Sequence, residues 1–171
     1  YVFDSFVGLP RPTGIDKSFE QFKEGEFSFG RNEFIKSVIA NTKLAGKQIT
    51  TYPNKKENKL FVVPGFYDQV LNKKLRNDLP DKKFSLVWID CDLYKSTVPV
   101  LDFITDFLEH GSLLVLDDWF CFRGDPNLGQ RKAIKEWLKK NKNISLVPYA
   151  SYSWHGYSFI VHKKNNNEFK K

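Results

Sequence analysis

The stretch "SLVWIDCDLYKST", Ser85–Thr97, changes from apolar to acidic within a few residues. Leu86–Ile89 is a continuous apolar run, which is typical of a strand buried inside a parallel sheet. Asp90 and Asp92 follow it almost at once. Carboxylates are unusual at the end of a run that enters the core, so the stretch predicts a central strand with a functional site at its end.

The rest of the chain predicts an alternation of strands and helices. The expected parallel strands are Tyr1–Phe3, Leu60–Val63, Phe84–Ile89 and Ser112–Leu116. The expected helices are Asn32–Gly46, Tyr67–Asp78, Ser96–Gly111 and Asn127–Asn141. Two final strands, Ile144–Trp154 and Gly156–Lys164, are expected to form a hairpin. This order predicts an α/β fold with a mostly parallel sheet and an antiparallel C-terminal edge.

Residue types at the ends of the expected helices predict where they begin and stop. Gly46 is expected to end the first helix. The helix after Asp92 would be capped by Ser96 or Thr97, with help from Asp92, and would stop at Gly111.

Three of the expected strands end in acids, namely at Asp4, at Asp90 and at Asp117–Asp118. The strands that end at Asp90 and Asp117 are joined by one helix, so they are expected to be parallel neighbours about 4.8 Å apart. Carboxylates brought together in this way are unfavourable unless they are protonated or neutralised. The sequence therefore predicts that Asp90, Asp117 and Asp118 bind a hard divalent cation, for which Mg²⁺ is best suited.

Composition narrows the class of protein. The 171 residues are 41% hydrophobic with a net charge of +7, which favours one domain over residues 1–162 followed by a disordered basic tail, 163–171. No apolar run has the length of about 20 residues that a membrane span requires. There is no Arg-rich helix of the kind that binds nucleic acid. Cys91 and Cys121 are expected to be free thiols of a cytoplasmic protein.

The D-C-D motif alone is also typical of two other enzyme classes. Haloacid-dehalogenase-type phosphatases begin with a strand and DxD, but they place Thr two residues after the second Asp, where this chain has Tyr94. Glycosyltransferases that use nucleotide sugars hold a metal with DxD, but "YVFDSFVGLP" at the start of the chain does not resemble their nucleotide-binding strands. Neither class accounts for the rest of the sequence.

Four motifs together resemble one family. They are "VFDSFVGLP" at Val2–Pro10, "VPGFYDQVL" at Val63–Leu71, "IDCDLYKST" at Ile89–Thr97 and "LLVLDDWF" at Leu113–Phe120. In this order they resemble the macrocin O-methyltransferases, which use S-adenosylmethionine to methylate sugar or phenol hydroxyls of macrolide and aminocoumarin antibiotics. The resemblance extends from Tyr1 to about Val161. It implies the class I methyltransferase fold, Mg²⁺, and a small-molecule acceptor that carries a hydroxyl group.

The resemblance also implies roles for single residues at the sheet edge. Asp90, Asp117 and Asp118 would hold Mg²⁺, and Asp90 would also be the general base. Asp4, together with Ser5, would hold the cofactor ribose, although Asp4 is also well placed to cap the turn that follows it.

Further residues have one functional and one structural interpretation. Gly65 and Phe66 would lie beside the cofactor adenine, or Gly65 would only shape a turn. His155 is either a second base or structural, and Gly8–Gly30 is either a lid or a surface loop. The aromatic residues expected either to form an acceptor pocket or to pack in the core are Trp119, Phe120, Tyr152 and Trp154.

The sequence departs from the family in two places. The glycine-rich turn that cradles the cofactor, and the strand before it, are absent upstream of Asp4. We therefore expect a longer intact protein and weak or absent cofactor binding by this chain, unless the gap closes or a partner chain fills it. The segment Phe122–Trp137 is longer than in the antibiotic-tailoring members, which leaves the acceptor open. A non-catalytic binding domain and a metal-dependent phosphohydrolase are the alternatives, and a homodimer is expected.

Overall fold

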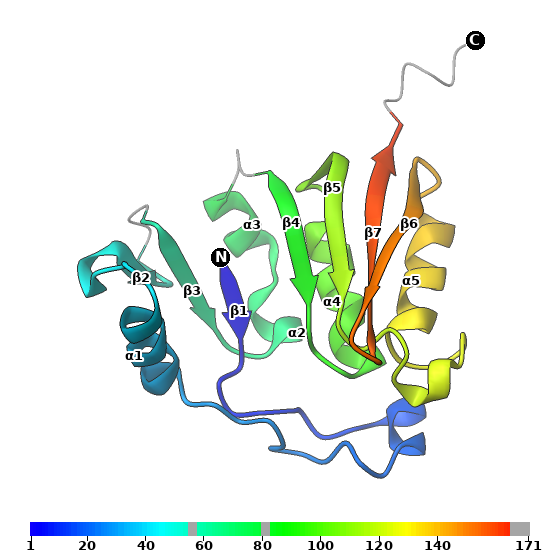
Figure 1. Ribbon diagram of the computed structural model, residues 1–171, viewed down its shortest axis with the longest axis horizontal. Coiled ribbons are helices and arrows are strands. Elements are labelled where there is room, and N and C mark those ends of the chain that lie inside the picture. The colour runs from blue at the N-terminus through cyan, green and yellow to red at the C-terminus, as the bar shows by residue number, and fades with distance from the viewer. Residues whose placement is uncertain (55–57, 80–82, 165–171) are drawn as a thin grey trace. The chain divides into compact units, whose positions relative to one another are not determined.

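The computed structural model (Figure 1) describes residues 1–54, 58–79 and 83–164. The chain divides into two compact units. The first unit is Tyr1–Pro12 with Gln21–Asp78, and the second is Thr13–Glu20 with Leu79–Lys171. The predicted basic tail lies mostly outside the described residues, although Lys163 is the last residue of a strand. Among the helices of the described part, none combines the length and apolarity that a membrane span requires.

The first unit contains a parallel three-stranded sheet with the order β1-β3-β2. Its strands are β1 (Val2–Asp4), β2 (Ile49–Thr51) and β3 (Leu60–Pro64). Its helices are α1 (Arg31–Asn41), the short 3-10 helix η2 (Gly46–Gln48), α2 (Tyr67–Val70) and α3 (Lys73–Asp78). The central strand β3 is the most apolar of the three, and its Val62 and Val63 are fully buried.

Two helix predictions in this unit are wrong in their extent. The first helix ends at Asn41, and Gly46 begins η2 instead of ending the helix. The expected helix over Tyr67–Asp78 is broken into α2 and α3. Asn72 lies at the break, where its side-chain oxygen accepts a hydrogen bond of 3.1 Å from the backbone N–H of Leu75. An Asn side chain that bonds to nearby backbone in this way starts a new helix and interrupts the old one. Strand β2 was not predicted.

The second unit contains a four-stranded sheet with the order β4-β5-β7-β6. Its strands are β4 (Phe84–Ile89), β5 (Leu108–Leu116), β6 (Ile144–Tyr152) and β7 (Gly156–Lys163), and its helices are η1 (Gly14–Ser18), α4 (Tyr94–Ile104), η3 (Phe122–Gly124) and α5 (Gly129–Lys140). Strands β4 and β5 are parallel neighbours, and the β6–β7 hairpin adds two antiparallel strands. The predicted fold class is therefore confirmed.

The boundary between α4 and β5 differs from the prediction. The helix ends at Ile104 rather than Gly111, and Leu108 is already the first residue of β5. Phe107 lies between them and stacks on Phe84 of β4 with ring centroids 4.8 Å apart. Gly111 has a φ of +91° inside β5, close to the register shift between β4 and β5. Its freedom at positive φ lets the longer strand bulge, so this glycine shapes a strand and not a helix end.

The two faces of the second sheet differ. Figure 1 shows α4 and α5 on one face, where Leu114, Leu116 and Val161 are fully buried in the core. Leu86 and Trp88 of β4 point the other way and are 58% and 57% exposed. Apolar residues on both faces of a strand are typical of a central position in a sheet.

Within the described residues, β4 has β5 as its only sheet neighbour, and β1 has only β3. The sequence led us to expect a missing strand between the strands that end at Asp4 and Asp90. That expectation, and that of a longer intact protein, stay predictions.

Candidate functional site

The carboxylates of Asp90, Asp117 and Asp118 are gathered at one end of the second sheet. Ile89 and Leu116 are paired residues at the ends of β4 and β5, and the backbone N–H of Asp117 donates to the carbonyl of Ile89 at 2.9 Å. Asp90 and Asp117, the residues that follow these two strand ends, therefore lie at the same edge of the sheet. One carboxylate oxygen from each of the three acids lies within 4.8 Å of the others. Asp90 is exposed, Asp117 is half-buried and Asp118 is buried.

Gln130, near the start of α5, holds Asp118 in place and was not predicted from the sequence. Its side-chain oxygen accepts from the backbone N–H of Asp118 at 3.0 Å. Its amide nitrogen donates to the carbonyl of Ile89 at 3.1 Å and to Asp118 Oδ2 at 3.2 Å. Gln130 is only 1% exposed. A glutamine on the apolar side of a helix, beside Ala133, Ile134 and Trp137, was the signal available in the sequence.

Asp117 is oriented by two residues of the β6–β7 hairpin. The hydroxyl of Tyr152 donates to Asp117 Oδ1 at 2.8 Å. His155 Nδ1 lies 2.7 Å from the carbonyl oxygen of Asp117 and 3.4 Å from its Oδ2. Burial, and then the hydrogen bond to Asp117, raise the pKa of Tyr152, so its hydroxyl stays protonated and remains a donor. His155 lies beside the acidic cluster, where it contacts Asp117 and is suited to positioning that carboxylate.

Asp92 is part of the acidic cluster and not a helix cap. Its backbone N–H donates to Asp118 Oδ2 at 2.8 Å. Burial, and then repulsion from Asp118 and Asp90, raise its pKa to about 8. Burial is also the main reason that the pKa of Asp118 is raised. A cluster of carboxyls that retains a proton near neutral pH lacks positive charge, which a bound cation would supply.

The start of α4 is capped by Asp16, a residue distant in the sequence. Its two carboxylate oxygens accept from the backbone N–H groups of Tyr94 and Lys95 at 2.9 and 3.0 Å. The predicted caps, Ser96 and Thr97, lie inside the helix instead, because it begins at Tyr94. Burial raises the pKa of Asp16, against the lowering effect of these two hydrogen bonds.

The middle of the predicted Gly8–Gly30 lid therefore belongs to the second unit. Besides Asp16, Phe19 packs on Phe122 with ring centroids 4.9 Å apart. The sequence gives no signal for this contact, since Asp16 and α4 are far apart along the chain. Whether the segment closes over a ligand stays a prediction.

The two cysteines flank the acids, but their chemistry differs from that of the carboxylates. Both are free. Burial raises the pKa of Cys91, and burial together with the Asp118 charge raises that of Cys121 to about 12. Protonated thiols are poor metal ligands, so the donors that the cluster offers are oxygens. This donor set suits Mg²⁺ or Ca²⁺ better than Zn²⁺.

The residues expected to hold the cofactor lie together in the first unit. The backbone N–H of Gly65 donates to the carbonyl of Asp4 at 2.8 Å, which joins the ends of β1 and β3. Asp4 Oδ1 accepts from the N–H of Phe6, and Ser5 Oγ donates to the carbonyl of Gly8 at 2.9 Å. Asp4 and Ser5 thus shape the turn after β1, the structural interpretation considered for Asp4. The turn takes up Oδ1 of Asp4, and the second oxygen of this carboxylate is suited to accept a hydrogen bond from a ribose hydroxyl.

Gly65 has a φ of +134°, and a Cβ on it would lie 2.4 Å from Cγ1 of Val70. Only glycine fits there, so Gly65 does shape a turn. Phe66 follows it, half-buried, as the residue before α2.

The four aromatic residues expected around an acceptor do not form one cluster. Trp119 packs against Phe159 of β7 with ring centroids 4.9 Å apart. Phe120 contacts Tyr157 edge-on, and Tyr152 contacts Trp88 at 5.4 Å. Trp154 is 75% exposed at the hairpin turn. Among the four, Tyr152 donates a hydrogen bond to one of the clustered acids, Asp117.

Comparison with known families gives a match over most of the chain. Residues 1–147 match the family model described as macrocin-O-methyltransferase (TylF). The chain belongs to this family. The match covers Asp4, Gly65 and all three clustered acids, so the predicted resemblance is confirmed. No curated protein sequence matches the chain.

Solved structures of O-methyltransferases share the fold of this macrocin O-methyltransferase family member. The O-methyltransferase NovP is 17% identical with a TM-score of 0.68, over 95% of this chain and 59% of its own. The calicheamicin methyltransferase CalS11 is 18% identical with a TM-score of 0.65, over 92% of this chain and 58% of its own. Apo CalS11, described as a TDP-rhamnose 3'-O-methyltransferase, is 16% identical with a TM-score of 0.52, over 92% of this chain and 56% of its own. The chain thus spans less than two thirds of the length of these structures.

Proposed function

We propose that this chain contributes the metal and acceptor site of an S-adenosylmethionine-dependent, Mg²⁺-dependent O-methyltransferase that acts on a hydroxyl of a sugar or another small molecule. One observation carries the proposal: a family member places Asp90, Asp117 and Asp118 at the ends of adjacent parallel strands, with oxygens from all three within 4.8 Å. Ligands of open α/β sheets bind at this edge.

The acidic cluster fits a hard cation. The protonated thiols of Cys91 and Cys121 leave carboxylate oxygens as the ligands. Tyr152 and Gln130 orient Asp117 and Asp118 with neutral hydrogen-bond donors, which fix the carboxylates without neutralising them. Outer hydrogen bonds of this kind are the usual support for metal ligands.

Each residue of the site has a role in the transfer. When bound, Mg²⁺ lowers the pKa of an acceptor hydroxyl, and S-adenosylmethionine supplies a methyl group activated on a sulfonium. Asp90 accepts the hydroxyl proton, for which its exposed carboxylate is suited. Asp117 and Asp118, held by the hairpin and by α5, fix the position of the acceptor relative to Asp90. His155 keeps Asp117 oriented through its contact with the Asp117 carbonyl.

Asp4 and Gly65 would hold the cofactor. A carboxylate accepts two hydrogen bonds from a vicinal diol, and Asp4 offers one at the end of β1. Gly65, without a side chain, lets a planar ring approach the backbone at the end of β3. A sugar hydroxyl is the acceptor that we favour, because one structural relative, CalS11, is described as acting on TDP-rhamnose.

The first test is calorimetric titration of Mg²⁺ into the chain, followed by S-adenosylhomocysteine with and without Mg²⁺. We expect Mg²⁺ binding that falls about a hundredfold or more in Asp90→Asn and Asp118→Asn, beyond the roughly 10–100-fold effect of outer-shell changes. Asp68→Asn, an exposed acid on α2, is the matched control.

Mg²⁺ binding that survives both substitutions would refute the metal centre. Binding of Mg²⁺ together with hydrolysis of p-nitrophenyl phosphate would favour the phosphohydrolase. Binding of S-adenosylhomocysteine that is lost in Asp4→Asn would support the cofactor site.

A further inference from the structure

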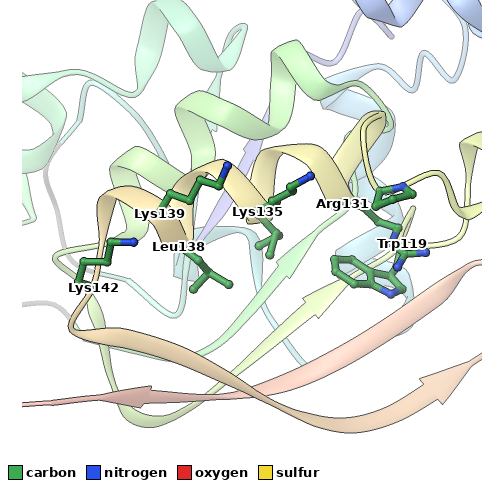
Figure 2. A pocket seen from close by; sticks show the side chains of 8 residues that line it. Trp119, Arg131, Lys135, Leu138, Lys139 and Lys142 are labelled. Carbon is green, nitrogen blue, oxygen red and sulfur yellow. The ribbon is translucent and has the colours of Figure 1, made fainter.

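A groove of about 480 Å³ follows one side of α5 in the second unit (Figure 2). We call it the α5 groove, and its lining residues are Trp119, Pro126, Arg131, Ile134, Lys135, Leu138, Lys139 and Lys142. Figure 2 shows Lys135 and Lys139 on the helix, with Arg131 and Trp119 at one end of the groove and Lys142, just past the last helical turn, at the other. None of these residues belongs to the acidic cluster.

The lining combines four cations with an apolar floor and contains no acid. Arg131, Lys135 and Lys139 follow one another at intervals of four residues, so they share one side of α5 over about 12 Å, and Lys142 lies in the turn after the helix. Within the described residues, these four side chains form no ion pair with a carboxylate. By contrast Lys132, outside the groove, pairs with Glu136.

Two of the four cations are held in place by neighbouring groups. The guanidinium of Arg131 donates to the carbonyl of Gly124 and lies 5.1 Å from the ring centroid of Trp119. Lys135 Nζ donates to Asn127 Oδ1 at 3.2 Å. A cation whose side chain is already ordered loses less entropy when an anion binds.

We propose that the α5 groove binds a phosphate-bearing small molecule of the nucleoside-diphosphate type. Its phosphates contact the lysines, and its apolar body packs against Pro126 and Leu138. The volume of the α5 groove is within the range of about 300–1,000 Å³ typical of small-molecule sites. A single carboxylate would leave most of the four cations unneutralised, whereas a diphosphate neutralises several at once.

The geometry disfavours larger polyanions and membranes. Single-stranded nucleic acid binds by stacking bases on open aromatic faces, but Arg131 already stacks on Trp119. A membrane surface would be contacted by protruding apolar side chains. The groove has its apolar residues in its floor, where Ile134 is only 3% exposed.

The test is titration of UDP into the whole chain in the presence of EDTA, which keeps divalent cations away from the acidic cluster. The groove variant carries Lys135→Glu with Lys139→Glu. The control carries Lys73→Glu with Lys74→Glu, which makes the same change in net charge on exposed residues of α3. We expect UDP binding to weaken at least about tenfold in the groove variant and to be nearly unchanged in the control.

Two further probes identify the source of the phosphate. Binding of inorganic pyrophosphate that is weaker than that of UDP would support a contribution from the apolar floor. Binding of phosphatidylserine vesicles but not UDP, with the same loss in the groove variant, would overturn the proposal, because the groove would then bind a lipid headgroup at a membrane.

The proposal is overturned if the unaltered chain binds none of these probes, or if the groove variant and the control lose affinity equally. It is also overturned if a single-stranded oligonucleotide binds more tightly than UDP and is lost in the groove variant, because the groove would then serve nucleic acid. Circular dichroism of both variants verifies that they fold.

Discussion

Gln130 is the residue whose replacement tests the structure of the acidic site most directly. We consider Gln130→Met, which keeps the length of the side chain and removes its polar atoms. In the structure this removes three hydrogen bonds, one accepted from the N–H of Asp118 and two donated, to the carbonyl of Ile89 and to Asp118 Oδ2. We expect the variant to lose stability and Mg²⁺ affinity together.

The magnitude follows from what each partner retains. The buried N–H of Asp118 is left without its partner, at about 1–3 kcal/mol. The carbonyl of Ile89 still accepts from the N–H of Asp117, so its loss is about 0.5–1.5 kcal/mol, and we assign a similar value to the carboxylate. Together these give a loss of about 2–6 kcal/mol, a large part of the roughly 5–15 kcal/mol typical of a folded domain. Mg²⁺ affinity should fall about 10–100-fold, as for other outer-shell changes.

The assay is urea denaturation followed by tryptophan fluorescence, together with calorimetric titration of Mg²⁺ for every variant that folds. Lys140→Met is the matched control, because it makes the same residue at an exposed position of the same helix. A loss of less than about 1 kcal/mol in Gln130→Met, with unchanged Mg²⁺ affinity, would refute the view that Gln130 positions Asp118.

Three other predictions concern pH, a helix cap and a glycine. The pKa of Asp92 is raised to about 8 in the folded chain, so the metal-free chain should lose stability as pH rises from about 4 to about 8 and should level off above that. Melting temperatures measured in EDTA over this pH range test the prediction. An Asp92→Asn chain whose melting temperature falls with the same slope would contradict it. Asp16→Ala should lose about 1–2 kcal/mol of unfolding free energy through the uncapped start of α4, with Asp16→Asn losing less; equal stability of all three chains would exclude the cap. Gly65→Ala should lose about 1–3 kcal/mol of unfolding free energy because of the positive φ at this position. Gly46→Ala, where an added Cβ would lie 3.6 Å from Ile39, is the control and should be nearly neutral. Urea denaturation curves of both variants test this, and a neutral Gly65→Ala would contradict it.

The parts of the fold that the sequence predicted are those encoded by continuous apolar runs. Strands β3 and β4 were predicted close to their true limits, because each is a continuous apolar run that ends abruptly, β3 at Pro64 and Gly65 and β4 at Asp90. The adjacency of β4 and β5 followed from one rule of connectivity, because two successive strands joined by a single helix usually lie side by side and parallel. That rule also predicted that Asp90 would lie near Asp117 and Asp118.

The missed features depend on contacts between distant segments. Gly111 was read as a helix stop, because a glycine after an apolar helical face is usually one, while its actual place in β5 depends on Phe107 packing against Phe84. Asp16 caps α4 from the short 3-10 helix η1, in a segment whose sequence has no clear periodic pattern. Gln130 could have been found as a polar residue among apolar ones, but its partners lie at the end of β4 and in the turn after β5, both distant in the sequence.

The surroundings of the acids argue for a binding role rather than a structural one. An acidic cluster that only stabilised the fold would be neutralised by Lys or Arg, as Glu136 is by Lys132. The contacts of Asp117 and Asp118 come instead from the Tyr152 hydroxyl, the Gln130 amide, the Cys121 thiol and the N–H of Asp92, with His155 beside Asp117. The hydroxyl, amide, thiol and backbone donors fix the direction of the carboxylates without neutralising them, and burial, followed by repulsion from Asp118 and Asp90, raises the pKa of Asp92. A cation bound there would relieve the unfavourable burial and mutual repulsion of these carboxylates, so its binding is favoured and stabilises the folded chain.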